Sequence, residues 1–305
     1  MRLWKAVEEL DLGGYGQGRS RSLRLPPSLK KLKVDMELSG PFPEWLWPAS
    51  LQQLELVRFG RSIIGAAWPP ALRQLSLGDR FNQPVAGVTW PASLQQLSFG
   101  YWFTKPIACE VWPASLQQLS PGRCFNQPID DVVWPTTLLS LDSGFDFNQP
   151  IVSVVWPVSL QRFSFGHSYN QPIVDVVWPT SLLKMDLGLA FSQRIAGVTW
   201  PASLQQLKSG KRFNQHVAGT VWPASLRRLE FGELFNQPIA DVCAWPLRLQ
   251  HRQLGTGFDH PMSGVLWPAS LVRVKRGNTV WNDKRRDSVL ICMIPPPEQG
   301  ARRRT

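Results

Sequence analysis

Apolar and polar positions alternate in short segments that return along the chain at a fixed interval. In a representative copy, the segment Gln96–Phe99 alternates polar and apolar residues, which predicts a strand with Leu and Phe facing a core. Gly100 follows, and we expect it to end the strand in a turn with positive φ. Phe103 and Ile107 then return the chain to the core.

The dipeptide Trp-Pro marks the interval, which is 22 residues except for one step of 21 and one of 23. Its tryptophans are Trp47, Trp68, Trp90, Trp112, Trp134, Trp156, Trp178, Trp200, Trp222, Trp245 and Trp267. A period of this size indicates stacked units, each touching only its neighbours. We therefore expect the indole rings of successive units to stack along one corner.

The unit reads W-P-x-S-L-x-x-L-x-F-G-x-x-F-N-Q-P-I-x-x-V-x, and its two prolines leave too little uninterrupted chain for a helix of several turns. The pattern predicts a solenoid with a parallel β-sheet on one face and extended or 3₁₀ segments, with little helix, on the other. About thirteen coils fall within residues 1–277. We assign residues 278–305 to a C-terminal cap segment and basic tail.

The Asn of F-N-Q-P recurs in six coils. A buried Asn can bond its own coil and the next one, so we expect a structural ladder, with a solvated loop residue as the alternative. Some coils have a residue at an inward position that departs from the repeat, and we expect these coils to pack less well. The departing residues are Pro121, Ser143, Ser209 and Arg252. Beyond the repeat, residues 288–294 are apolar, and we expect them to cover the edge of the last coil, a disordered tail being the alternative.

The motif S-L-x-x-L-x-F-G, at Ser93–Gly100, followed by F-N-Q-P-I, at Phe125–Ile129, resembles the FNIP repeat, a relative of the leucine-rich repeats. The resemblance covers about residues 1–277. It implies a leucine-rich-repeat-like, right-handed solenoid. It implies no reaction, cofactor or catalytic residue, and protein binding is the usual expectation for such repeats.

The net charge of +11 lies mainly at the ends of the chain. Residues 41–246 carry 14 basic and 13 acidic side chains, whereas residues 247–305 carry 11 and 4. A groove for nucleic acid would need Lys or Arg repeated along one face, and the repeat lacks that stripe. Nucleic acid is therefore disfavoured as a partner, although binding of nucleic acid or an acidic partner through the basic ends stays open as an alternative.

No pattern in the chain indicates catalysis or metal binding. The four histidines and four cysteines recur at no repeat position and have no metal-ligand spacing, and no nucleophile elbow or phosphate-binding loop occurs. We expect a protein that is not an enzyme, with no cofactor and free thiols. The amino-terminal segment does not resemble a signal peptide and no run is long enough to span a membrane, so a cytoplasmic location is expected.

The outward side of the sheet is the candidate binding surface, because arrays present variable residues on a constant scaffold. Its predicted partner-binding residues are Gln96, Ser98, Gln118, Ser120, Arg162, Lys184, Asp186, Gln206, Lys208, Arg228 and Glu230. We interpret the chain as a scaffold for protein partners of unknown identity. A repeat array without a dedicated ligand stays open because several copies are nearly identical. A chain that is one piece of a larger gene product stays open as well.

Overall fold

The computed structural model describes residues 6–13, 25–35, 47–108, 111–242, 244–262, 264–276 and 279–282. These residues form one 14-stranded sheet whose strands follow one another in sequence order. The first thirteen strands are parallel, and no α-helix occurs in the described ranges. The predicted solenoid with a parallel β-sheet on one face is therefore confirmed.

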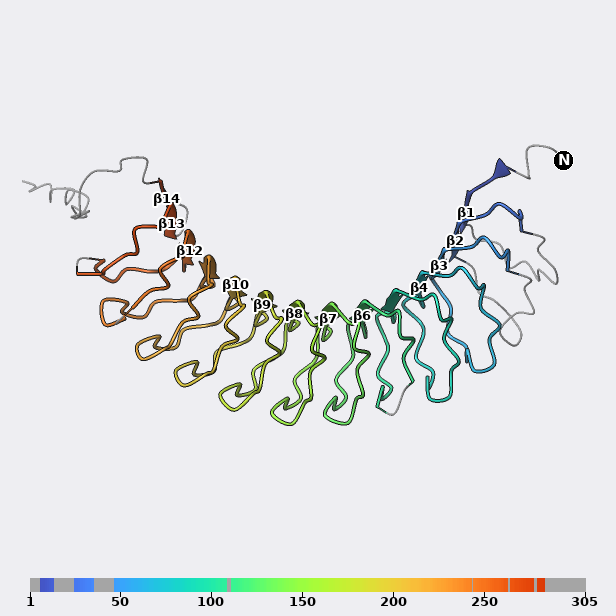
Figure 1. Ribbon diagram of the computed structural model, residues 1–305, viewed down its shortest axis with the longest axis horizontal. Coiled ribbons are helices and arrows are strands. Elements are labelled where there is room, and N and C mark those ends of the chain that lie inside the picture. The colour runs from blue at the N-terminus through green and yellow to red at the C-terminus, as the bar shows by residue number, and fades with distance from the viewer. Residues whose placement is uncertain are drawn as a thin grey trace, which may run out of the picture.

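The strands are short because each contributes one face of a coil before the chain turns away. Their bounds are β1 Glu9–Gly13, β2 Lys31–Asp35, β3 Gln53–Leu56, β4 Gln74–Ser76, β5 Gln96–Ser98, β6 Gln118–Ser120, β7 Ser140–Asp142, β8 Arg162–Ser164, β9 Lys184–Asp186, β10 Gln206–Lys208, β11 Arg228–Glu230, β12 His251–Leu254, β13 Arg273–Arg276 and β14 Thr279–Asn282. The coils fan outward from these strands, which line the inner side of an arc (Figure 1).

The register places equivalent residues of successive coils directly side by side. Leu97 of β5 pairs with Leu75 on one side and with Leu119 on the other, and all three are buried. The second inward residue, Phe99, and the returning Phe103 are buried as well, as the alternation predicts. The buried residues therefore form one continuous core that runs through the described coils.

Aromatic side chains form two stacked columns in this core. In six pairs of Trp residues from neighbouring coils, the indole rings lie 5.7–6.5 Å apart between centroids, which confirms the predicted corner stack. The Phe of F-N-Q-P forms a second column that continues without a break from Phe59 to Phe258, with centroids 5.9–6.3 Å apart. Tyr169 takes the place of Phe in one coil.

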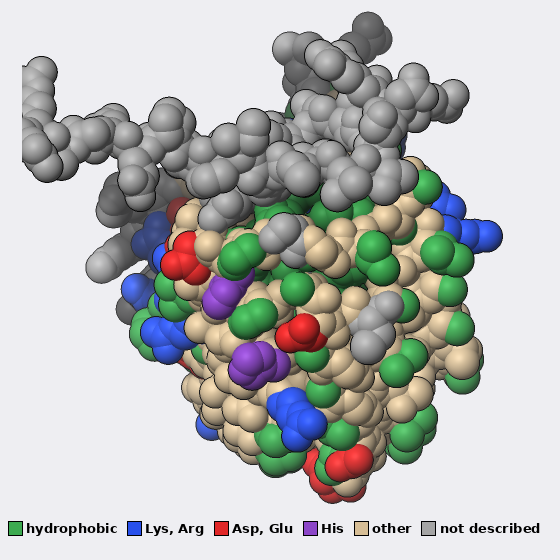
Figure 2. All heavy atoms as spheres, turned by 90° about the vertical axis from the view of Figure 1, so that its left-hand side faces the viewer, with side chains coloured by type: hydrophobic (Ala, Val, Ile, Leu, Met, Phe, Trp, Pro, Cys, Tyr) green, Lys and Arg blue, Asp and Glu red, His purple; other side chains and the backbone are tan. Residues whose placement is uncertain are grey.

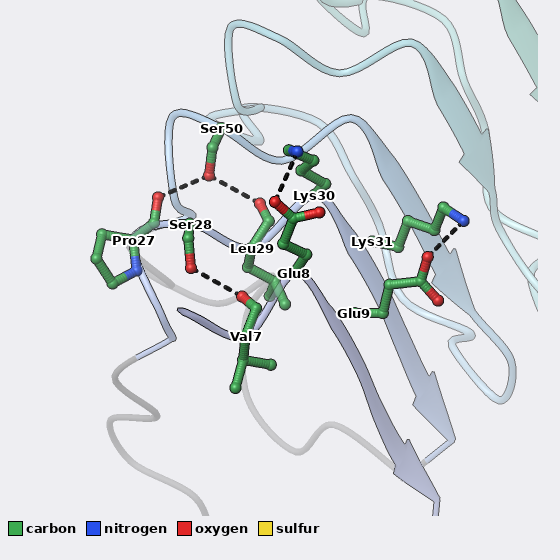
Figure 3. Close-up of polar contacts among 9 residues, drawn as sticks. All are labelled: Val7, Glu8, Glu9, Pro27, Ser28, Leu29, Lys30, Lys31 and Ser50. Carbon is green, nitrogen blue, oxygen red and sulfur yellow. Dashed lines mark hydrogen bonds and ion pairs between the residues drawn. The ribbon is translucent and has the colours of Figure 1, made fainter. Parts of the chain in front are cut away.

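A hydroxyl ladder joins the coils beside the Trp-Pro corner. Ser28 Oγ donates to the carbonyl of Val7 at 2.9 Å, and Ser50 Oγ donates to the carbonyls of Pro27 and Leu29 at 2.7 and 2.8 Å (Figure 3). The same bond, from the Ser of S-L-x-x-L to a carbonyl 21 residues earlier, recurs through Ser270. The Ser of the motif is thus a structural donor that satisfies backbone oxygens at the turn.

The Asn of F-N-Q-P also forms a ladder, but it is not buried. Asn126 Oδ1 accepts from the backbone N–H of Asn148 at 2.9 Å, and Asn148 Oδ1 accepts from that of Asn170 at the same distance. Both bonds reach the next coil, which confirms the ladder, whereas the side chains are half-buried or exposed. The expected burial is wrong because the loop side of each coil lies at the outer surface.

The glycine after each strand is explained mainly by close approach of backbones. At Gly100 a Cβ atom would lie 1.4 Å from the carbonyl oxygen of Gly78, yet φ at Gly100 is not positive, so the predicted turn geometry is wrong there. Gly78 and Gly122 do have positive φ, at 62° and 93°, and are crowded as well. Only a residue without a side chain fits where successive turns touch.

At the carboxyl end, β14 pairs antiparallel with β13. A parallel array would otherwise continue in one direction, so this reversal places Thr279–Asn282 along the side of the last parallel strand. The sequence assigned that position to residues 288–294, which lie outside the described residues. The strand was missed because its four residues are too few for alternation to be recognised.

The predicted weak coils contain buried polar groups. Ser143 and Ser209 are 3% and 1% exposed, and their hydroxyls have no hydrogen-bond partner within the described part of the chain. Arg252 is 2% exposed in the column of inward Leu residues, with its guanidinium carbon 3.6 Å from the ring centroid of Trp245 and 4.6 Å from that of Trp267. Burial lowers the pKa of this guanidinium.

Candidate interaction surface on the concave sheet face

The concave sheet face is formed by the outward residues of the strands, and it contains every predicted partner-binding residue. Each strand contributes two such side chains, which the parallel register arranges in two columns. All are half-buried or exposed, and they are Gln96, Ser98, Gln118, Ser120, Arg162, Lys184, Asp186, Gln206, Lys208, Arg228 and Glu230. His251 and Gln253 continue the same columns into β12.

Ion pairs neutralise both acidic groups among these residues. Lys208 Nζ lies 2.7 Å from Asp186 Oδ2, a contact between neighbouring strands. Arg228 Nε contacts Glu230 Oε1 within a single strand. Exposed pairs of this kind contribute about 0–1 kcal/mol to stability. Their main effect here is on the electrostatic potential of the sheet face, because the two ion pairs neutralise two positive and two negative charges.

Arg162 and Lys184 are the basic residues of this group that remain unpaired in the described structure. Their Cα atoms are register partners on β8 and β9, so the two side chains start from adjacent strands about 4.8 Å apart. Both side chains are exposed. The face therefore carries two adjacent cations without an ion-pair partner, which we call the cationic site.

The surface around this site changes character along the arc. Between β4 and β6 the outward residues are Gln and Ser, which carry no charge. The two shallow grooves over the face have volumes of about 830 and 390 Å³, the first over β1–β7 and the second over β7–β11. The second groove includes Arg162 and Lys184. A partner lying along the face would meet amide and hydroxyl groups first and the cationic site next.

The titratable side chains of the described residues do not gather into a metal site. No cluster of three or more His, Cys, Asp or Glu side chains that could hold a metal occurs among them. Burial, with Asp146 nearby, raises the pKa of the Cys124 thiol, which disfavours the nucleophilic thiolate. Burial also raises the pKa of Tyr169. The described part of the chain contains no helix that is long and apolar enough to cross a membrane.

Sequence reasoning missed a second polar and aromatic feature, the turn that follows each strand. The two residues between the Gly and the Phe of each unit differ in every coil from β4 to β12, while their neighbours repeat. Tyr101, Arg123, Phe145 and His167 occupy the first of these positions in four successive coils. Variable residues between a repeated Gly and a repeated Phe were the signal in the sequence that could have pointed to this surface.

The basic side chains visible at the carboxyl end of the array do not form a continuous stripe. Figure 2 shows Lys and Arg separated by apolar, acidic and uncharged groups over the described part of this face. A surface that follows a nucleic-acid backbone would present cations at regular intervals. The visible face does not have that arrangement.

The comparisons with known proteins agree with this architecture. Residues 147–189 match the family model described as FNIP Repeat. These residues run from the Phe of one F-N-Q-P motif through β8 and β9 to the turn after β9. No curated protein matches the chain by sequence.

Two solved structures with the same fold are informative. The first, titled as the crystal structure of CroV588, a novel circular LRR protein, has a TM-score of 0.77 and 32% identity and covers 89% of this chain. This chain spans 43% of the length of that protein. The second, TLR13 in complex with ssRNA13, has a TM-score of 0.57 and 15% identity over 82% of this chain and 43% of its own. At that identity the likeness is one of fold.

Proposed function

We propose that this chain, an FNIP-repeat relative of the leucine-rich-repeat proteins, is a non-catalytic scaffold that binds a protein partner on its concave sheet face. A repeat array holds its surface residues in fixed register, so little ordering is needed when a partner binds. The partner's identity is not specified by this surface.

The cationic site at Arg162 and Lys184 is the observation that carries the proposal. Both charges lie on adjacent strands in the middle of the concave face and have no ion-pair partner in the described structure, whereas Lys208 and Arg228 are already paired. Two cations without ion-pair partners lie beside an uncharged polar surface. This arrangement favours a partner that offers carboxylates to the cations and hydrogen-bonding groups to the remaining surface.

The direct test is capture of partners by the full chain and by a variant with Arg162, Lys184 and Arg228 changed to Glu. A matched control variant has Arg194, Arg212 and Arg248 changed to Glu; these residues are exposed and lie outside the sheet face. Partners that bind the concave face should be lost from the first variant and retained by the second. Equal recovery with all three proteins would remove the proposed site.

Binding of nucleic acid or an acidic partner through the basic ends is the second candidate. Residues 247–305 carry 11 basic and 4 acidic side chains, which favours it. Titration with salt separates the two proposals, because an interface that neutralises several phosphates loses affinity steeply as salt rises. A shallow dependence would leave the sheet face as the binding surface.

The remaining proposals concern organisation and location. We assign the solenoid to residues 1–277 and a cap segment with a basic tail to residues 278–305, and we place the protein in the cytoplasm. Limited proteolysis tests the first assignment, because a folded array should resist cleavage while an exposed tail should not. Fluorescence microscopy of a tagged chain tests the second.

A further inference from the structure

The turns that follow β5, β6, β7 and β8 form a ladder of aromatic and cationic side chains along the rim of the sheet. Arg123 lies between two rings, its guanidinium carbon 5.0 Å from the Tyr101 centroid and 3.9 Å from the Phe145 centroid. His167 stacks on Phe145 with centroids 4.5 Å apart. The ring of Trp102 lies 4.7 Å from that of Tyr101 between centroids, and Trp102 is 57% exposed. We call these five residues the rim ladder.

Backbone hydrogen bonds fix the rim ladder in place. The amide after each ladder position donates to the carbonyl of the preceding coil, so the N–H of Cys124 bonds Tyr101 O at 2.8 Å and that of Asp146 bonds Arg123 O at 2.8 Å. The N–H of Ser168 bonds Phe145 O at 2.9 Å. A rigid surface loses little freedom on binding, which favours affinity.

The environment of Arg123 leaves one part of its guanidinium available. Its guanidinium carbon lies over the rings of Tyr101 and Phe145, and the described structure contains no hydrogen bond or ion pair to its N–H groups. The rings therefore hold in place a planar set of donors that has no partner in the described structure. This geometry suits two parallel hydrogen bonds to a carboxylate, which Lys cannot reproduce.

We propose that the rim ladder binds an extended protein segment that carries a carboxylate next to an aromatic or proline side chain. The carboxylate would bond the edge of Arg123, and the neighbouring apolar side chain would lie on Trp102 and Tyr101. Trp, Tyr and Arg are the residues most often responsible for binding energy at protein interfaces. The same row of turns contains the acids Asp79 and Asp146 as well as the bases Arg80 and Arg123, so it lacks the uniform positive charge that a phosphate backbone requires, and charge favours a protein over nucleic acid.

This surface is separate from the concave face, so the two proposals can be tested independently. The full chain is used to select from a displayed library of short random peptides, and the enriched peptides are titrated against it and its variants. Peptides bound by the rim should contain Asp or Glu beside an aromatic residue or proline. Binding should weaken about tenfold or more in Arg123→Gln, Arg123→Lys and Trp102→Ala, because each removes a contact of the segment.

Matched variants separate binding from folding. Lys211→Gln changes the equivalent position in a later coil, where Lys211 pairs with Glu233 at 2.9 Å, and should leave peptide binding unchanged. Arg162→Gln and Lys184→Gln on the concave face should also leave it unchanged. Because Trp102 is exposed, Trp102→Ala should weaken binding without lowering the melting temperature.

Three outcomes would overturn the proposal. One is an exhaustive selection that yields no peptide dependent on Arg123 and Trp102. The second is full binding by Arg123→Lys, or full binding by a peptide whose acid has been changed to the amide, since either would show that no planar pairing is involved. The third is displacement of the peptides by homopolymeric single-stranded RNA that itself depends on Arg123, which would identify the rim as a nucleic-acid surface.

Discussion

The rings of Phe125 and Phe147 lie 6.2 Å apart between centroids and within 5° of parallel, although the strands of their two coils are hydrogen-bonded neighbours. Parallel strands are spaced by about 4.8 Å, so each coil is thicker on its aromatic side than at its sheet. Repeated through the array, this difference bends the stack toward the strands. It explains why the sheet lines the inner side of the arc (Figure 1).

Phe163→Ala should lower the free energy of unfolding by about 3–5 kcal/mol, because it empties a core position shared by neighbouring coils. Phe163 is 2% exposed and its ring lies 4.7 Å from that of Trp156 and 4.6 Å from that of Phe165. Chemical denaturation measures the loss. Phe163→Leu, which restores the residue used in most coils, is the control and should cost less than about 1.5 kcal/mol. An unchanged midpoint for Ala would contradict the burial.

Gly100→Ala should destabilise the array by about 1–3 kcal/mol, because the added methyl would collide with the carbonyl of Gly78 in the preceding coil. Gly257 is the matched control. It has an ordinary φ and open space around the added Cβ, so Gly257→Ala should be neutral or should stabilise by about 0.4–1 kcal/mol. Thermal and chemical unfolding of both variants check the pair. Equal effects would show that close approach does not explain the glycine column.

Arg252→Leu should raise the free energy of unfolding by about 1–4 kcal/mol, because a buried cation without a hydrogen-bond partner is replaced by the residue of the neighbouring core column. Arg248→Leu changes an exposed residue nearby and should alter stability by less than about 0.5 kcal/mol. Denaturant unfolding compares the two. If Arg252→Leu destabilised the protein, the contacts of the guanidinium with Trp245 and Trp267 would outweigh its desolvation.

Tyr169→Phe should stabilise the protein and reduce its loss of stability in alkali. The Tyr169 hydroxyl is buried without a hydrogen-bond partner in the described structure, and burial raises its pKa. In the unfolded chain the pKa is about 10, so above that pH the unfolded state releases a proton that the folded state keeps, and stability falls.

The measurement is the free energy of unfolding from neutral pH to pH 11 for both proteins. Their difference should grow above pH 10, in favour of Tyr169→Phe. Tyr101→Phe, on the half-buried rim, should retain the alkaline loss caused by Tyr169. Parallel curves for the wild-type protein and Tyr169→Phe would contradict the assignment.

The sequence by itself determined the period, the strands and the sheet face. Alternation in segments such as Gln96–Phe99 specifies which side chains enter the core, and the repetition of Trp-Pro requires equivalent residues to lie side by side. Arg252 was also recognisable as a misfit, because a fixed register assigns it an inward position.

The tertiary structure decided the features that depend on distances between coils. Local sequence cannot show that Gly100 is crowded by Gly78, that Asp186 neutralises Lys208, or that Arg123 lies between two rings. Each of these contacts joins residues about 22 positions apart, so its geometry follows from how closely successive turns stack. The repeat determines which residues become neighbours, and the packing of the coils determines what those neighbours do.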